Sequence, residues 1–187
     1  VSMGFVSLSS LLISSYRIFF QDGNDIIAKE FSLFLAMISI FAASAVWSGM
    51  RALRFKGRKA PHRNIIDLAF SALRLLTGLA VGIYGFTHNN LLLTYFPILP
   101  IVSGISDLRY WLQPQTERMH WWFHHLENMF TASIGTVTAF LVTAVPRLLQ
   151  LSQTDIPALL WFAPTIIMLP TAKIMAARYR KRFALKK

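Results

Sequence analysis

Long runs of apolar residues alternate along the chain with short polar and charged stretches. A run of about 20 mostly apolar residues is long enough to cross a bilayer as an α-helix. Six runs meet this condition, at residues 1–20, 31–50, 65–87, 91–112, 119–144 and 158–177. The pattern therefore predicts an all-α fold, a polytopic transmembrane helix bundle in which residues 1–187 form a single domain.

The composition supports lipid as the solvent of these helices. Hydrophobic residues make up 55% of the 187 residues and the mean hydropathy is +0.49. Charged residues make up 14%, well below the quarter or so that is usual in soluble domains. A soluble domain of this size could not bury so much apolar surface in one core. The absence of cysteine excludes disulfides, thiol catalysis and thiolate metal sites.

The 19 basic residues are distributed unevenly between the two sides of the predicted spans. Fifteen lie between the second and third spans, around the turn after the fourth, or at the end of the sixth. Arg17, Lys29 and Arg147 lie on the other side, and Arg74 lies within a span. Cytoplasmic loops carry an excess of Lys and Arg, so both ends of the chain, including the C-terminus, are expected in the cytoplasm. The net charge of +11 then indicates topology, and no nucleic-acid partner is expected.

Arg74 is the most unusual residue, because it lies about ten residues into the third span, near the middle of the bilayer. An unpaired charge there costs at least ~2.5–3.5 kcal/mol, so an acidic partner is expected. Glu127 in the fifth span lies at a compatible depth, while Asp107 and Asp67 are shallower but within reach of a long side chain. Two interpretations stay open: a structural ion pair, or a site for a solute, a proton or a cofactor carboxylate.

The start of the fifth span is rich in histidine. His120, His124 and Glu127 share one helical face and are weak candidates for a metal site, without an evident fourth ligand. His125 and Met129 lie on another face and are of types that ligate haem iron. Adjacent turns of one helix cannot supply both sides of one haem, so a second histidine from another helix would be needed. The sequence identifies no cofactor.

Small residues and prolines recur within the spans. The small residues favour close helix packing, and the prolines predict bends in the fourth and sixth spans. These residues are Gly78, Gly82 and Gly85; Thr131, Gly135, Thr138 and Ala139; and Pro97, Pro100, Pro164 and Pro170. No nucleophile elbow, phosphate-binding loop, zinc-protease motif or dinucleotide fingerprint occurs, so the sequence predicts no enzymatic activity.

Four stretches of the chain carry a family resemblance: Trp47–Arg58, Asp107–Arg109, His125–Val142 and Leu159–Arg182. They resemble a family of predicted bacterial multi-pass membrane proteins of unknown function. The most specific stretch is a His-Leu-x-x-Met helix that leads into Thr-Ala-Phe-Leu-Val. The resemblance singles out Gly49, Arg51, Asp107, Arg109, His125, Met129, Thr138 and Pro164. It implies a bacterial cytoplasmic (inner) membrane and a further helix upstream of Val1, and it supplies no activity.

Three functions stay open at this point. The first is a non-enzymatic subunit of a larger bacterial membrane complex, for example a respiratory or photosynthetic one, packed through its small-residue faces. The second is a small transporter or ligand-binding protein that uses Arg74, Glu127 and Asp107, with Arg109 nearby. The third is a haem or quinone redox protein that uses His125. The expected partners are the lipid bilayer and other membrane-protein subunits.

Overall fold

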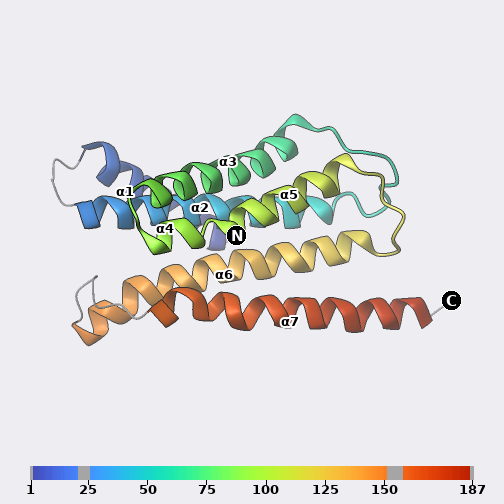
Figure 1. Ribbon diagram of the computed structural model, residues 1–187. Helices are drawn as coiled ribbons and strands as arrows, with labels where there is room; N and C mark the ends of the chain where they lie inside the picture. Colours follow the sequence, from blue (N-terminus) through green and yellow to red (C-terminus); the bar gives the residue numbers. More distant parts are fainter. Residues whose placement is uncertain (1, 21–25, 151–157, 186–187) are drawn as a thin grey trace.

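The computed structural model describes residues 2–20, 26–150 and 158–185. Over these ranges the regular secondary structure is α-helical, without a β-strand. The helices are α1 Ser2–Phe20, α2 Ile26–Ala52, α3 Ile65–Thr87, α4 Leu91–Tyr95, α5 Ile98–Leu112, α6 His120–Leu149 and α7 Ala158–Leu185. They form six units long and apolar enough to cross a membrane, with α4 and α5 together making one of them (Figure 1). The predicted all-α transmembrane bundle with six spans is confirmed.

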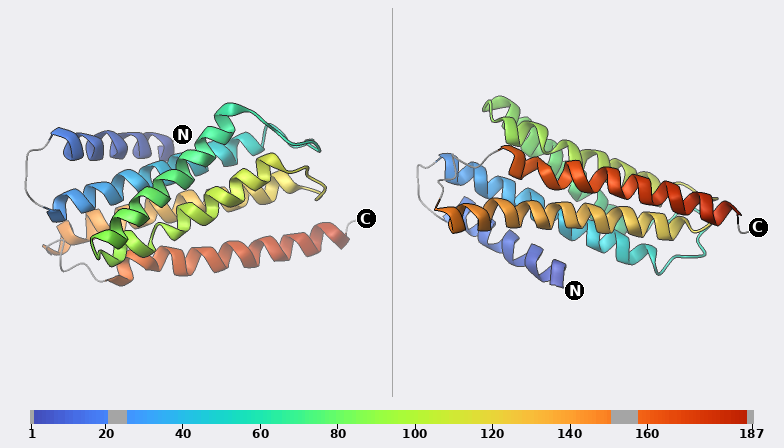
Figure 2. Two further views of the ribbon diagram at one scale, coloured as in Figure 1. Left: turned by 45° about the horizontal axis from the view of Figure 1, so that its top comes forward. Right: turned by 90° about the horizontal axis from the view of Figure 1, so that it is seen from below.

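Helix α2 lies at the centre of the bundle. It packs against α1, α3 and α6, while α5 packs on α3 and α7 packs on α6 (Figures 1 and 2). Its membrane-spanning stretch is the most buried of the six described ones, as a central position requires. The main buried cluster consists of Phe34, Leu35, Met37, Ile38, Phe41, Leu93, Phe96, Val142 and Trp161. The core therefore lies where α2 meets α4, α6 and α7.

The fourth span is broken between Tyr95 and Ile98. Pro97 has no N–H group, so it cannot donate a hydrogen bond to the carbonyl group of Leu93 one turn earlier. The backbone of Leu93 instead lies against Gly85 of α3. The bend that prolines predict for this span is thus a short turn between two helices.

Helices α6 and α7 extend five or more residues past their predicted C-terminal ends. Helix α6 continues through Pro146 to Leu149, and α7 continues to Leu185, whereas the hydropathy pattern ended these spans at residues 144 and 177. Hydropathy marks the segment that suits the hydrocarbon layer, and helical hydrogen bonding continues beyond it into polar sequence. The rest of the predicted connection, residues 151–157, lies outside the described residues.

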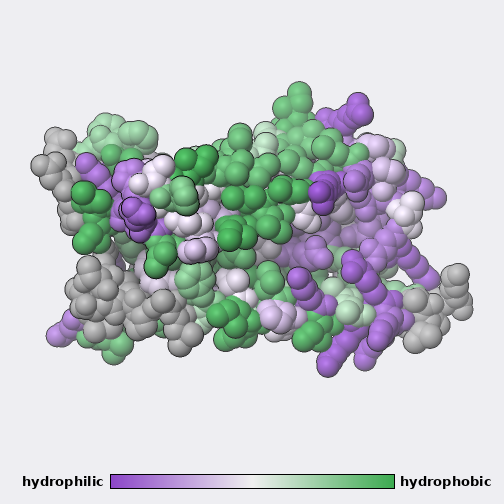
Figure 3. Space-filling model, viewed as in Figure 1, coloured by the Kyte–Doolittle hydropathy of each residue, from purple (hydrophilic) through white to green (hydrophobic). Residues whose placement is uncertain are grey.

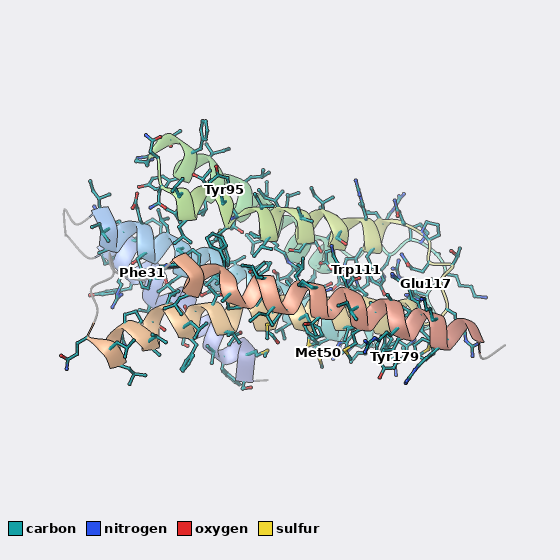
Figure 4. The ribbon with its side chains drawn as sticks, turned by 60° about the horizontal axis from the view of Figure 1, so that its bottom comes forward. Phe31, Met50, Tyr95, Trp111, Glu117 and Tyr179 are labelled. Carbon is teal, nitrogen blue, oxygen red and sulfur yellow. The ribbon has the colours of Figure 1, made fainter. Side chains whose placement is uncertain are left out.

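One end of the bundle is markedly hydrophilic. The loops at residues 53–64 and 113–119 meet there, and α7 ends there (Figures 1 and 3). Arg58 ties the first of these loops to the end of α5, because its Nη2 group donates to the carbonyl oxygen of Tyr110 at 2.7 Å and its Nη1 group donates to that of Trp111 at 3.1 Å. Trp111, Glu117 and Tyr179 lie toward this basic end, and Phe31 and Tyr95 lie toward the other (Figure 4). An apolar surface separates the two ends (Figure 3), as a multi-pass membrane protein requires.

Candidate functional site

Asp107 of α5 is the centre of a buried polar cluster to which four helices contribute. Its Oδ1 atom accepts a hydrogen bond from Ser48 of α2 at 2.6 Å and lies 2.9 Å from Nε2 of His124 of α6. Its Oδ2 atom accepts from Ser71 of α3 at 2.6 Å and lies 3.7 Å from Nη2 of Arg74, also of α3. Asp107 is 1% exposed, so these groups take the place of water around the carboxylate.

Arg74 is equally buried, with 1% of its surface exposed. Its Nε group donates to Ser44 at 2.9 Å and its Nη2 group donates to the Oδ1 atom of Asn128 at 3.3 Å. Together with Asp107, these contacts compensate the positive charge of Arg74 within its membrane span. The Nη1 group makes no hydrogen bond within the described part of the chain, and so two N–H donors of Arg74 are unused.

The imidazole of His124 is held in one orientation. The ring of Tyr110 stacks on it with a centroid separation of 3.5 Å and an interplanar angle of 4°, and Trp111 meets it edge-on at 5.8 Å. A carboxylate oxygen accepts hydrogen bonds and does not donate them, so Nε2 of His124 carries the proton in its contact with Asp107. The ring therefore connects the buried carboxylate to α6.

A cavity of about 40 Å³ lies beside this cluster, between α5 and α6. It is lined by Arg74, Ser103, Ser106, Asp107, His124, Glu127, Asn128 and Thr131. A volume of this size has room for about one to three water molecules. Ser106 and Glu127 are exposed, so the cavity reaches the side of the bundle at their position. The lining combines acidic, basic and hydroxyl groups, which is unusual within a transmembrane span.

A second buried carboxylate lies nearer the basic end. Asp67 of α3 accepts two hydrogen bonds from Arg51, at 2.8 Å to each of its oxygens. His62 contributes Nε2 at 2.8 Å, and Trp47 contributes its indole N–H at 2.9 Å. Asp67 thereby ties the end of α2 and the following loop to the start of α3. The cavity beside Asp107 does not reach Asp67.

The structure brings together some of the predicted site residues and separates others. Arg74 and Asp107 form the ion pair, and Glu127 lies at the exposed rim of the cavity without an ion-pair partner among the described residues. Of the three acidic residues within reach in the sequence, Asp107 pairs with Arg74, and Glu127 does not. Arg109 is exposed, because two residues along an α-helix turn its side chain by about 200° from Asp107. Asp67 pairs with Arg51 and leaves Arg74 to Asp107.

His125 and Met129 both contact Gly49 of α2. Nδ1 of His125 donates to the carbonyl oxygen of Gly49 at 2.9 Å, and a Cβ atom at Gly49 would lie 2.6 Å from Cε of Met129. The donation fixes the proton of a neutral His125 on Nδ1 and leaves Nε2 as an acceptor. The two residues thus form a close α2–α6 contact, which gives them a packing role.

The three weak metal candidates point to different partners. His120 meets the hydroxyl group of Tyr110 through Nδ1 at 3.0 Å, His124 contacts Asp107, and Glu127 lies at the cavity rim. Among the residues that the structure describes, no three His, Cys, Asp or Glu side chains gather closely enough to hold a metal ion. The shared helical face of these residues does not bring their donor atoms together.

Sequence reasoning missed the uncharged members of the cluster, which are Ser44, Ser48, Ser71 and Asn128. A signal was present, because Ser44 and Ser48 are one turn apart in an apolar span, as are Ser71 and Arg74. Polar side chains at membrane depth find partners on neighbouring helices, so such pairs mark the buried polar face.

Comparison of the chain with models of protein families, with curated proteins and with solved structures found no match. The family resemblance of the four stretches therefore stays a prediction, and the function is argued from the site alone.

Proposed function

We propose that the protein binds a small polar ligand within the membrane and acts as a small transporter or ligand-binding protein. The observation that carries this proposal is the polar cavity between α5 and α6, which joins the buried Arg74–Asp107 pair to the exposed Glu127. Ionisable groups inside a membrane mark solute and proton pathways by default.

An ion pair that only locks helices together needs no cavity beside it. Here Asp107 and Arg74 already have protein partners, and further polar groups surround an adjoining space that packing does not fill. A polar cavity in this position costs stability unless its groups find other partners. The unused Nη1 donors of Arg74 and the carboxylate of Glu127 are such groups, which favours a ligand over a purely structural role.

The lining also indicates the class of ligand. Arg74 and the hydroxyl groups of Ser103, Ser106 and Thr131 offer hydrogen-bond donors, whereas Glu127 offers an acceptor with negative charge. The site suits a water-sized species, such as a hydrated proton, or a small solute with both acceptor and donor groups. Because the cavity holds only about one to three water molecules, a larger solute requires α5 and α6 to move apart. Such a movement is compatible with the packing, in which α5 rests on α3 and α6 rests on α2 and α7.

Glu127→Gln tests the proposal most directly, because Glu127 is exposed and its replacement disturbs no packing. Purified protein in proteoliposomes on a solid-supported membrane is challenged with protons, inorganic ions, amines and amino acids in turn. We expect at least one of these probes to give a current that Glu127→Gln abolishes. Arg74→Lys, which keeps the charge but loses the planar fork, should reduce the same current at least tenfold.

Glu117→Gln is the matched control, since Glu117 is an equally exposed carboxylate in the loop before α6, and its loss should leave the current intact. The absence of any current for the whole panel, or equal currents for wild type and Glu127→Gln, would contradict the proposal. If Arg74→Leu lowered the Tm of the protein but gave wild-type currents below that temperature, the pair would be structural.

A second candidate is a non-enzymatic subunit of a larger bacterial membrane complex. The exposed carboxylate of Glu127, seven residues into α6, favours this function, because a neighbouring subunit could cover a charge that lipid does not solvate. Extraction in a mild detergent followed by native mass measurement separates the two candidates. A monodisperse protein without co-purifying chains would count against the complex.

We also propose that the protein lies in the bacterial cytoplasmic membrane, with the basic end of the bundle on the cytoplasmic side. The support is the distribution of Lys and Arg, because thirteen of the 17 that the structure describes lie on the side of this end. The Asp107 cluster then lies in the cytoplasmic half of the membrane.

A further inference from the structure

A groove of about 560 Å³ runs between α1, α2 and α6, on the opposite side of α2 from the Asp107 cluster. Its walls are mainly apolar and include Ile13 of α1 and Leu35 and Ile38 of α2. At the end where α1 and α6 terminate, Arg17 and Arg147 both line the groove. A second cavity of about 320 Å³ continues from this end and is lined by the same two arginines with Thr143 and Gln150.

Helix α1 contributes a row of polar side chains to this groove, beside Val6 and Ile13. Ser7, Ser10, Ser14 and Arg17 follow each other at helical spacing and all line it. Ser14 is 1% exposed, and its hydroxyl group has no hydrogen-bond partner within the described residues. Helix α1 runs at an angle to α6 (Figure 2), and its packing is mainly on α2. A buried hydroxyl without a partner, in a groove that two arginines also line, indicates a ligand.

We propose that this groove binds one anionic phospholipid. The phosphate would lie between the guanidinium groups of Arg17 and Arg147, which hydrogen-bond phosphate oxygens in pairs. Ser14 lies three residues before Arg17 on α1. At 1.5 Å per residue, Ser14 is therefore about 4.5 Å deeper in the membrane than Arg17. That is the level of the glycerol ester carbonyls, to which its hydroxyl group can donate. One acyl chain then follows the apolar walls.

The positive charge at one end of the groove favours a lipid with a negatively charged headgroup. Among the basic residues that the structure describes, only Arg17, Lys29 and Arg147, besides Arg74, lie away from the basic end of the bundle, and two of these three line this one site. Two positive charges favour a lipid with a net negative headgroup over a zwitterionic one. The apolar groove that continues from the arginines favours a lipid over a free anion, since a free phosphate would leave those walls without a partner.

Thermal unfolding of the purified protein in a non-ionic detergent tests the proposal. Added phosphatidylglycerol should raise the Tm by about 5 °C at saturation, because a ligand that binds only the folded state stabilises it. The double variant Arg17→Gln/Arg147→Gln should lose at least half of this shift. Arg63→Gln is the matched control, because Arg63 is an exposed arginine at the basic end and its loss should leave the shift unchanged.

Three outcomes would overturn the proposal. An equal shift with phosphatidylcholine would show that the acyl chain alone is bound, and an equal shift with inorganic phosphate would show a site for a free anion. A full phosphatidylglycerol shift in the double variant would exclude the two arginines.

Ser14→Ala provides a check that does not depend on the arginines. Removal of an unpartnered buried hydroxyl group should leave the lipid-free Tm unchanged or higher, and should weaken the phosphatidylglycerol shift. A lower lipid-free Tm with an unchanged shift would assign Ser14 to packing and would count against its contact with the lipid.

Discussion

Two ion pairs of this protein have the same nitrogen–oxygen distance and very different surroundings. Arg51–Asp67 and Arg180–Glu117 both measure 2.8 Å. The side chain of Asp67 is 0% exposed, whereas those of Arg180 and Glu117 are 50% and 45% exposed. Burial decides the energy here, because an exposed pair exchanges its partner for water at little cost while a buried charge cannot.

We therefore expect Asp67→Asn to lower the free energy of unfolding by about 3 kcal/mol, at the lower end for a broken buried pair because Arg51 keeps some contact with solvent. Glu117→Gln should change it by less than about 1 kcal/mol. Unfolding in mixed detergent micelles, followed by the loss of helical circular dichroism, measures both. Equal effects of the two variants would contradict the role given to burial.

For single residues, the sequence identifies Arg74 as unusual but does not determine which acidic residue pairs with it. A charge inside an apolar run is visible without any structure, so Arg74 could be identified directly. Its partner depends on the rotation of α3, α5 and α6 about their own axes, which hydropathy does not report. Glu127 and Asp107 were both within reach, and the rotation of α6 turned Glu127 outward while α5 turned Asp107 inward.

Among the helices, the close approach of α3 to the short helix α4 depends on one glycine. A Cβ atom at Gly85 would overlap the backbone of Leu93 and lie 2.6 Å from the amide nitrogen of Thr94. At Gly82, one turn earlier on the same helix, the nearest atom would be Cβ of Pro97 at 3.5 Å, an ordinary contact. Only the first of these positions requires glycine, although the spacing of small residues suggested both.

Gly85→Ala should destabilise the protein by about 3 kcal/mol, at the upper end for overpacking because the clash is with backbone and not with a flexible side chain. Gly82→Ala should be neutral, or more stable by up to about 1 kcal/mol through its helix propensity. The same detergent unfolding experiment gives both values. A Gly85→Ala variant as stable as wild type would mean that α4 can withdraw from α3 without loss.

The ends of helices are where hydropathy is least informative. The third span was predicted at its observed bounds, Ile65–Thr87, and in the structure the side chain of Asn64 caps its first turn. Helix α7 runs to Leu185, eight residues past its predicted end, since basic residues leave the membrane without leaving the helix. The break at Pro97 was predicted only as a bend, because its form depends on how closely α3 approaches α4.

For the whole molecule, the uneven distribution of charge predicts the orientation of the bundle in the membrane. The loops at residues 53–64 and 113–119 and the end of α7 lie together at one end of the bundle, and the turn between α3 and α4 lies at the other (Figure 1). Thirteen of the fifteen basic residues that sequence analysis assigned to one side are described by the structure, and they lie in these loops or in the halves of α2, α5 and α7 nearer this end. The fold therefore gathers them at one membrane surface, and the excess of Lys and Arg predicts that this surface is cytoplasmic.

The absence of cysteine makes this orientation testable with single introduced thiols. His88→Cys places a thiol at the turn after α3, while Gly57→Cys and Thr116→Cys place one in each loop of the basic end; all three positions are exposed. In right-side-out membrane vesicles, a membrane-impermeant maleimide should label only His88→Cys, and permeabilisation should expose the other two. The reverse pattern would invert the orientation and move the Asp107 cluster to the outer half of the membrane. Labelling of all three thiols from one side would contradict the arrangement of the spans, because an odd number of crossings separates residue 88 from both loops.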